Sequence, residues 1–263
     1  MWSSAELKER AKVALTGTYW KAFAISLIIS FLAGGGGGSS GGNAGSSFSQ
    51  MQDGSGNFDL GGFLAILAIV LGIFAIVFIF AVAFKTFISN PIIVGGRKYF
   101  IEAAEAVNGE EQARFGLLGF GFKGNNYMEI VKPMFLVDLY VLLWTLALII
   151  PGIIASYTYK MVPYILADNP NIGTKRALEL SKQMTDGEKM DIFILDLSFI
   201  GWYLLGLLAC CVGVLFVQPY YDSTQAELYR VLREKALDSN MCSFEELGFA
   251  SPEQDSINSD NEM

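Results

Sequence analysis

Long apolar runs alternate along the chain with shorter polar segments that carry most of its charge. Six of these runs, counted with their flanking residues, have the length and hydrophobicity of membrane-spanning helices. We predict an all-α fold, a polytopic membrane helix bundle of six transmembrane helices arranged as three hairpins. The predicted spans are residues 18–36, 62–84, 133–150, 152–168, 191–209 and 212–229.

Two of the predicted hairpins share a sequence pattern that indicates an internal repeat. A phenylalanine, an aspartate and a tryptophan recur with identical spacing at the start of each, and Pro-Tyr follows at the end. In the first copy these are Phe135, Asp138, Trp144 and Pro163-Tyr164; in the second they are Phe193, Asp196, Trp202 and Pro219-Tyr220. The middle hairpin should turn at Pro151-Gly152, and the last near Ala209–Gly213, because these small or helix-breaking residues interrupt the apolar runs.

Polar segments between the hairpins show helical amphipathicity. Leu7, Ala11, Ala14 and Leu15 lie on one face of a helix that begins after Ser3, and a second such helix begins near Thr174. We expect both to lie in the membrane interface on the cytoplasmic side. With the six spans they form a membrane domain over residues 1–236.

Two low-complexity regions lack the apolar residues needed for a packed core. Residues 34–61 are rich in Gly and Ser and predict a flexible outer loop. Residues 237–263 carry acidic residues and no basic ones, and predict a disordered cytoplasmic tail.

Basic residues set the predicted topology. The chain has 18 Lys and Arg, and all except Lys160 fall in the segments that a six-helix arrangement puts in the cytosol. Positive residues concentrate in cytoplasmic loops. We therefore predict a multi-pass protein of the bacterial cytoplasmic membrane with both termini in the cytoplasm.

The residue inventory argues against an enzyme. The chain has no histidine, which removes the commonest general base and metal ligand. Its three cysteines, two of them adjacent at Cys210-Cys211, lack the spacing of a metal site. We expect no cofactor and no catalytic or metal-binding residues. The net charge of −8 arises mainly in the tail, so a nucleic-acid partner is not expected.

Three ionisable residues lie within predicted spans and are candidate intramembrane polar sites: Asp138, Lys160 and Asp196. Their distances from the turn at Pro151 place Asp138 and Lys160 within reach of each other across the middle hairpin. The pair has two interpretations, a structural one as a neutralised ion pair and a functional one as part of a transport pathway.

Four cations in the cytoplasmic segments are candidate ligands for anionic lipid headgroups: Arg97, Lys98, Lys175 and Arg176. The alternative is that they are ordinary solvated charges of the inner surface.

Several short motifs, in order and at matching spacing, resemble an uncharacterised family of bacterial integral membrane proteins known as domain of unknown function 975. They begin at Glu6 and Tyr19-Trp20-Lys21, continue at Pro151-Gly152 and around Pro163-Tyr164, and end with Asp196 to Trp202 and Pro219-Tyr220. The similarity covers about residues 4–236 without the Gly/Ser loop, and more distantly the arrangement resembles the membrane domain of some glycerophosphodiester phosphodiesterases. The resemblance implies a membrane location and six helices, and it implies no activity and no site residues.

We therefore predict a non-enzymatic integral membrane protein that organises lipids or partner proteins at its inner face. Its partners would be the lipid bilayer, anionic lipid headgroups and other membrane proteins. The alternative is a small-molecule or lipid transporter that uses Asp138, Lys160 and Asp196 inside the bundle.

Overall fold

The computed structural model describes residues 2–15, 19–32, 60–106, 115–124, 126–208 and 212–249, and the regular structure of these residues is entirely helical. The predicted all-α fold is therefore confirmed for this part of the chain. The α-helices are α1 (Ser4–Leu15), α2 (Tyr19–Leu32), α3 (Leu60–Phe84), α4 (Asn90–Glu105), α5 (Asn126–Ala147), α6 (Ile149–Thr158), α7 (Val162–Asp168), α8 (Thr174–Met184), α9 (Lys189–Leu208) and α10 (Val212–Asp238).

Length and composition identify three helices that are able to cross a membrane. They are Ile66–Glu105, Asn126–Ala147 and Lys189–Leu208, and a fourth arises if α1 and α2, which meet at 110°, form one broken span. The side chains of α3 from Ile66 to Phe80 are all exposed, and all but Gly72 are apolar. Such a surface is stable only in contact with lipid or with another apolar surface. The chain is thus a multi-pass membrane protein.

Helices α5 and α6 form the predicted middle hairpin, but the turn differs from expectation. It lies at Leu148, whose backbone is extended, and α6 then runs through Pro151 in its first turn, where the missing amide hydrogen breaks no helical bond. Gly152 instead packs on α5: a Cβ there would lie 2.6 Å from the Thr145 Cα.

The predicted span 152–168 is not one helix. Helix α6 ends at Thr158, a turn follows at Tyr159–Met161, and α7 begins at Val162. Ten residues of α6 extend about 15 Å, which is half of the hydrocarbon core of a bilayer.

A π-helical segment at Lys85–Ser89 joins α3 to α4 without interrupting the helical path. It precedes Pro91, which has no amide hydrogen to donate to the Phe87 carbonyl four residues earlier. The Tyr127 hydroxyl of α5 donates to that carbonyl instead, at 2.9 Å. A side chain from the next hairpin thus satisfies the backbone group that the proline leaves free.

Both amphipathic helices bury one apolar face, and for α1 this is the predicted one. Leu7, Ala11, Ala14 and Leu15 of α1 are buried, and α1 packs on α10. In α8, Ala177, Leu178 and Met184 are buried. The core of the described chain is built around α4, α7, α8 and the second half of α10, with Tyr99, Tyr164 and Tyr229 among its buried side chains.

The first part of the predicted disordered tail is folded. Helix α10 continues to Asp238, and a 3-10 turn at Glu245–Leu247 follows, with Leu247 fully buried. Gly248, at a φ of +82°, takes the left-handed conformation that glycine accommodates best, and the chain then returns through a hydrogen bond from the Phe249 amide to the Phe244 carbonyl. Residues 250–263, most of the Gly/Ser loop and the tip of the last hairpin at 209–211 lie outside the described residues.

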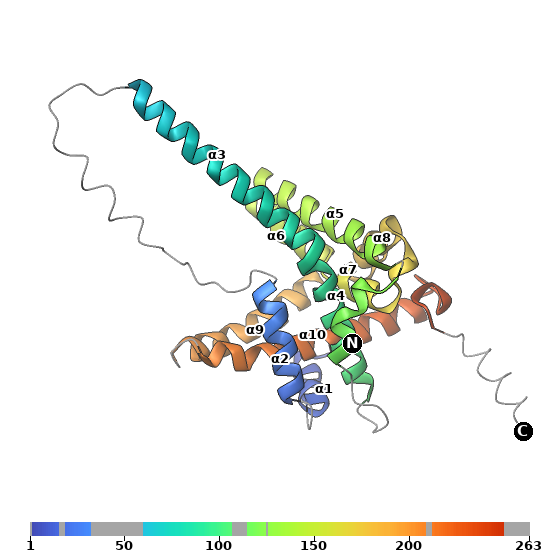
Figure 1. Cartoon of the computed structure of the whole chain (residues 1–263). Coiled ribbons are helices and arrows are strands. Elements are labelled where there is room, and N and C mark those ends of the chain that lie inside the picture. Colours follow the sequence, from blue (N-terminus) through green and yellow to red (C-terminus); the bar gives the residue numbers. More distant parts are fainter. Residues whose placement is uncertain are drawn as a thin grey trace, which may run out of the picture.

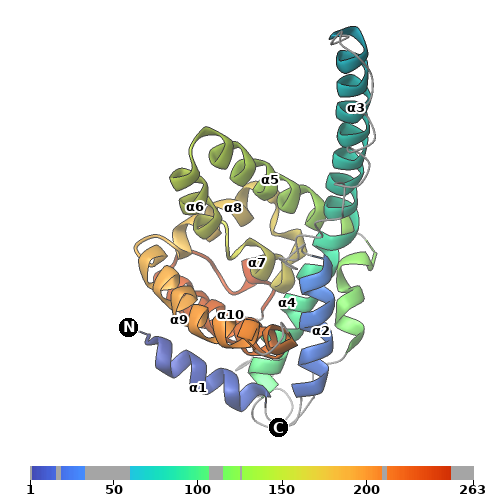
Figure 2. The same cartoon turned by 90° about the vertical axis from the view of Figure 1, so that its left-hand side faces the viewer.

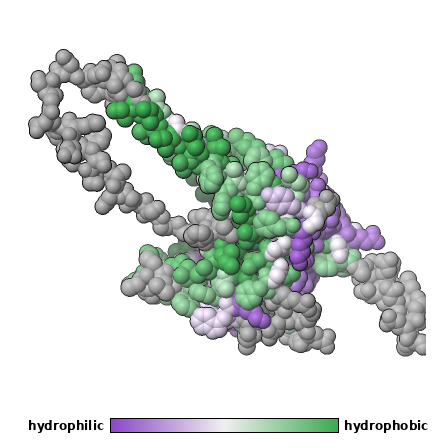
Figure 3. Space-filling model, in the orientation of Figure 1, coloured by the Kyte–Doolittle hydropathy of each residue, from purple (hydrophilic) through white to green (hydrophobic). Residues whose placement is uncertain are grey.

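Figure 1 shows α3 and the hairpins α5/α6 and α9/α10 leaving a common base that contains α4 and α7. In the view turned by 90°, α4 and α7 lie between the two hairpins and α2 (Figure 2). Hydrophobic surface covers α3 and the face beside it, whereas hydrophilic residues gather at the opposite end (Figure 3). The helices that leave the base therefore carry the membrane-facing surface.

Candidate functional site

Lys160 lies in the turn between α6 and α7, and its ammonium group forms a salt bridge with Asp196 of α9. The Nζ atom is 2.7 Å and 2.9 Å from the two carboxylate oxygens. Their side chains are only 17% and 21% exposed. A charge in such a place is costly unless it is paired, and here each charge neutralises the other.

Three further side chains donate hydrogen bonds to the Asp196 carboxylate. The hydroxyl groups of Tyr157 and Tyr221 lie 3.0 Å and 3.2 Å from it, and the Gln225 amide lies at 2.9 Å. Tyr157 belongs to α6, whereas Tyr221 and Gln225 belong to α10. With Lys160, these donors fill the acceptor positions of the carboxylate and tie α6, α9 and α10 together.

Asp222 of α10 is the centre of a second buried group. Its carboxylate is fully buried and accepts from the Arg97 guanidinium at 2.6 Å, the Ser26 hydroxyl at 2.6 Å and the Gln218 amide at 3.3 Å. The Arg97 guanidinium also lies 5.2 Å from the centre of the Tyr164 ring. Helices α2, α4 and α10 therefore meet at one carboxylate.

The two groups are neighbours because they share a face of α10. Gln218, Tyr221, Asp222 and Gln225 are spaced i, i+3, i+4 and i+7, which aligns them along one side of a helix. Tyr221 and Gln225 bind Asp196, whereas Gln218 binds Asp222. Asp222 was not among the predicted site residues. The helical spacing of these four polar residues within the apolar span 212–229 does indicate a polar face that packs against other helices.

The predicted ion pair between Asp138 and Lys160 is wrong. Asp138 forms a salt bridge with Lys85 at 2.7 Å and accepts from the Asn90 amide at 3.2 Å. The prediction assumed a single hairpin with its turn at Pro151, in which Asp138 and Lys160 would lie opposite each other. The actual turn at Leu148 and the early end of α6 place Lys160 beside α9 instead.

The four predicted headgroup ligands have different environments. Arg97 is only 17% exposed and is engaged by the buried Asp222, so its guanidinium is not available to a headgroup. Lys98 donates to the Ala167 carbonyl at 3.0 Å and lies over the Phe120 ring. Lys175 is exposed at the start of α8 and retains the access that headgroup binding requires.

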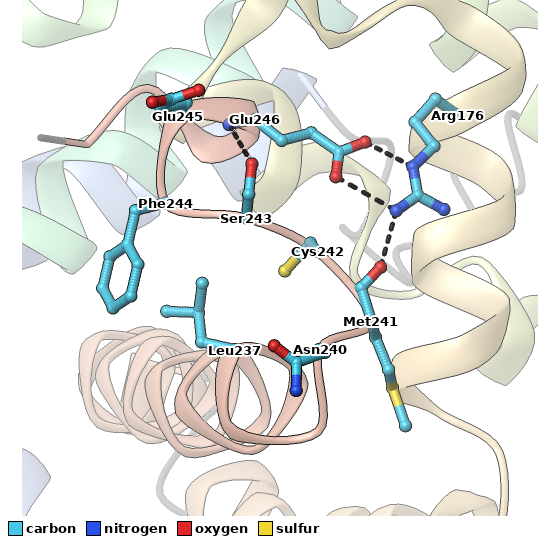
Figure 4. Close-up of a pocket in the computed structure, with 9 residues that line it drawn as sticks. All are labelled: Arg176, Leu237, Asn240, Met241, Cys242, Ser243, Phe244, Glu245 and Glu246. Carbon is cyan, nitrogen blue, oxygen red and sulfur yellow. Dashed lines mark hydrogen bonds and ion pairs between the residues drawn. The ribbon is translucent and has the colours of Figure 1, made fainter. Parts of the chain in front are cut away.

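Arg176 is occupied by the returning C-terminal segment (Figure 4). Its guanidinium forms a two-pronged salt bridge with Glu246, in which Nη2 lies 3.0 Å from Oε2, and it donates to the Met241 carbonyl at 2.6 Å. The hydrogen bond from Arg176 lowers the pKa of Glu246. The same contact raises the pKa of Arg176. A groove of about 500 Å³ lies between this segment and the end of α10.

Two apolar grooves flank α6 near the Lys160–Asp196 pair. One of about 290 Å³ is lined by Tyr157 and Phe193, and one of about 220 Å³ by Trp144 and Thr158. Neither has Asp138, Lys160 or Asp196 in its lining. Among the described residues no group of three acidic, cysteine or histidine side chains is placed to hold a metal ion. Asp138, Lys160 and Asp196 thus lie in salt bridges and outside the lining of these two grooves.

A family described as protein of unknown function (DUF975) matches residues 58–236, which is more than half of the chain. The chain belongs to the DUF975 family. The match includes α3 to α10 and begins after α1 and α2, so Ser26 lies outside it, whereas Arg97 and Asp222 lie inside it. No curated protein and no solved structure gives a significant match to this DUF975 protein. The resemblance to the membrane domain of glycerophosphodiester phosphodiesterases therefore finds no named relative to support it.

Proposed function

We propose that this DUF975 protein is a non-enzymatic scaffold of the cytoplasmic membrane that organises lipids or partner proteins at its inner face. The observation that carries the proposal is the way its ion pairs connect three helical units. The first unit is α2 to α4, the second is α5 to α7, and the third is α9 and α10. Lys85–Asp138 joins the first to the second, Lys160–Asp196 the second to the third, and Arg97–Asp222 the first to the third.

This closed set of contacts is the arrangement expected of a structural framework. Asp138, Lys160, Asp196 and Asp222 each have a charged partner on another unit. The carboxylates receive additional donors from tyrosine, serine, asparagine or glutamine. A buried ion pair contributes little net stability, but it specifies which helices pack together, as polar residues do in coiled coils. The pairs therefore select one arrangement of helices that would otherwise be held by apolar contacts alone.

The units also support the proposed internal repeat. Asp138 in α5 and Asp196 in α9 occupy matching positions of the repeated sequence pattern. Each forms a salt bridge with a lysine of the preceding unit. We propose that the units descend from one hairpin, with six membrane-crossing segments and both termini in the cytoplasm. In this topology α6 and the first half of α10 complete the hairpins that α5 and α9 begin.

Cysteine labelling tests the topology. In a background with Cys210, Cys211 and Cys242 changed to serine, an impermeant thiol reagent should label Ser46→Cys on intact cells. Asp186→Cys, on a side chain that is 83% exposed in the turn before α9, should be labelled only after permeabilisation. Labelling of both positions on intact cells would exclude the six-segment arrangement.

Organisation of lipids or partners is tested by purification in mild detergent, followed by analysis of the lipids and proteins that remain bound. The expected result is enrichment of anionic lipid or of a defined membrane protein over the total membrane extract. A bound fraction with the composition of the bulk membrane would contradict the scaffold.

One observation favours the alternative of a transporter: the Lys160–Asp196 and Arg97–Asp222 pairs lie along the same face of α10. A Lys160→Met, Asp196→Leu double variant separates the two proposals. A scaffold should keep its bound lipids and partners in this variant, whereas a transporter should keep its fold and lose uptake of its substrate in vesicles.

A further inference from the structure

A groove between α1, the start of α2 and the hairpin α9/α10 combines positive charge with aromatic surface. It encloses about 690 Å³ and is lined by Lys8, Glu9 and Lys12 of α1, by Tyr19 of α2, by Trp202 of α9 and by Tyr220 of α10, among others. Its volume is in the range of small-molecule sites, which span about 300–1,000 Å³. The two lysines and one glutamate give it a net positive charge.

Lys8 is the cation in this groove that has no carboxylate partner among the described residues. Its Nζ atom donates to the Ser198 hydroxyl at 2.7 Å and lies 4.4 Å from the centre of the Phe199 ring. Neither contact neutralises the ammonium charge. Glu9, the one acidic residue of the lining, already forms a salt bridge with Lys12 at 2.7 Å. An anion beside Lys8 would therefore meet an uncompensated positive charge.

The groove opens onto membrane-facing surface. Trp202 and Leu205 of α9 are 52% and 63% exposed, and α9 has the length and composition of a spanning helix. Trp20, at the start of α2, is 72% exposed. Tryptophan and tyrosine are typical of the level of the lipid headgroups, where one part of the ring is apolar and another is wet. A ligand here needs an anionic head and an apolar body.

We propose that this groove binds an anionic phospholipid, whose phosphate lies beside Lys8 and whose acyl chains lie along Trp202. The inference rests on the proposed function, because it names a lipid class that the scaffold would organise. Two features support a lipid over a soluble phosphate compound: the aromatic lining, and the continuity with the exposed apolar surface of α9. The site differs from the predicted headgroup ligands of α4 and α8, which lie on other helices.

Quenching of Trp202 fluorescence by brominated lipids tests the proposal. The protein, with Trp2, Trp20 and Trp144 changed to phenylalanine, is placed in nanodiscs of phosphatidylcholine containing a small fraction of brominated phosphatidylglycerol or brominated phosphatidylcholine. Quenching should favour phosphatidylglycerol by about fivefold, which is the effect of one basic residue near a membrane surface. Lys8→Gln should abolish this preference and Lys8→Arg should retain it.

Lys182→Gln removes one exposed lysine of α8 and serves as the matched control, with the preference expected to remain. Inorganic phosphate added to the discs should leave the quenching unchanged. Three results would overturn the proposal: equal quenching by both lipids, an equal loss in Lys8→Gln and Lys182→Gln, or displacement by free phosphate. If the preference is absent while anionic lipid still co-purifies with the protein, the groove assignment fails and the scaffold stands.

Discussion

At the scale of the residue, Lys160 shows how little an isolated charge reveals about its partner. Its position inside an apolar segment predicted that the charge would be paired, and Lys160 does form a salt bridge. The partner is Asp196, and Asp138 is engaged by Lys85. Single positions thus determine that a charge must be neutralised, and the packing of three units determines by which residue.

The first prediction concerns this pair. Lys160→Met or Asp196→Leu alone should lower the melting temperature in detergent, because each leaves the other charge buried without its partner at a cost of about 3–5 kcal/mol. The double variant should recover much of that loss. The control combines Lys160→Met with Asp138→Leu, whose effects should add because the two residues are not partners. If stability recovered in the control, and the losses added in the Lys160–Asp196 double variant, the partner of Lys160 would be Asp138 and not Asp196.

At the scale of the element, close contacts between helices depend on glycines at particular positions. Gly206 of α9 faces α10 so closely that a Cβ would lie 2.6 Å from the Val214 backbone nitrogen. Gly201, one and a half turns earlier, has nothing within 4 Å of that position. Small residues at helix contacts allow backbones to approach, which is a main source of packing energy in membranes.

We therefore expect opposite results from two substitutions in α9. Gly206→Val should force α9 and α10 apart and destabilise the protein by about 1–3 kcal/mol, as overpacking does. Gly201→Ala should be neutral or stabilising by up to ~1 kcal/mol, because alanine favours the helix more than glycine does. Melting in detergent measures both. Equal destabilisation by the two would show that the α9/α10 contact is not as close as described.

The C-terminal segment 239–249 is an element held in part by one titratable contact. The Arg176 hydrogen bond lowers the pKa of Glu246 below its ordinary value of 4.5. A carboxylate with a depressed pKa stabilises the folded form above that ordinary value, and the stabilisation is lost as the pH falls through the lower, folded value. Docking of the segment should therefore weaken only below about pH 4.5.

Cys242, which is buried in this segment, reports the docking. With Cys210 and Cys211 changed to serine, the reactivity of Cys242 with a dipyridyl disulfide should be low at neutral pH. At each pH the rate is divided by the rate for the unfolded chain, and this ratio should rise about tenfold in acid. The reason is that protonation of Glu246 removes a hydrogen bond to a charged group, which is worth about 1.5–3 kcal/mol. Glu246→Gln should show the higher reactivity at neutral pH as well. A reactivity that is constant with pH would show that the Arg176–Glu246 contact does not hold the segment in place.

At the scale of the whole molecule, the N-terminal helices complete a core that the family match does not include. The match begins at residue 58, yet Ser26 of α2 donates to the fully buried Asp222. Ile29 of α2 also fits over Gly96 of α4, where a Cβ would lie 2.2 Å from the Ile29 Cδ1. Residues 58–236 therefore share part of their buried polar network with the segment before them.

This dependence predicts that the chain can be divided in the region between α2 and α3. Fragments 1–57 and 58–263, expressed together, should co-purify in mild detergent because buried polar and apolar contacts join them. Ser26→Leu should weaken the association, since it removes a donor from a buried carboxylate and adds bulk there. Val13→Leu, at a side chain of α1 that is 53% exposed, is the control and should leave it intact. Failure of the unaltered fragments to associate would contradict the packing of α2 on α4 and α10.

Much of the architecture follows from the sequence alone because it depends on local chemistry. Apolar runs such as residues 62–84 have to become helices, since the bilayer offers no partner for an unpaired backbone group. The buried faces of α1 and α8 follow from the 3.6-residue period, and Leu7, Ala11, Ala177 and Met184 lie where that period places them.

Only the tertiary structure decided which charges meet. The partners in Lys85–Asp138, Arg97–Asp222 and Lys160–Asp196 are separated by 36 to 125 residues, and no period along the chain relates them. The turn at Leu148 and the early end of α6 place Lys160 beside α9. The π segment before Pro91 and the return of residues 239–249 likewise involve side chains from other elements, Tyr127 and Arg176. Hydrophobic periodicity thus determines which surface of a helix is buried, whereas packing between helices determines what that surface contacts.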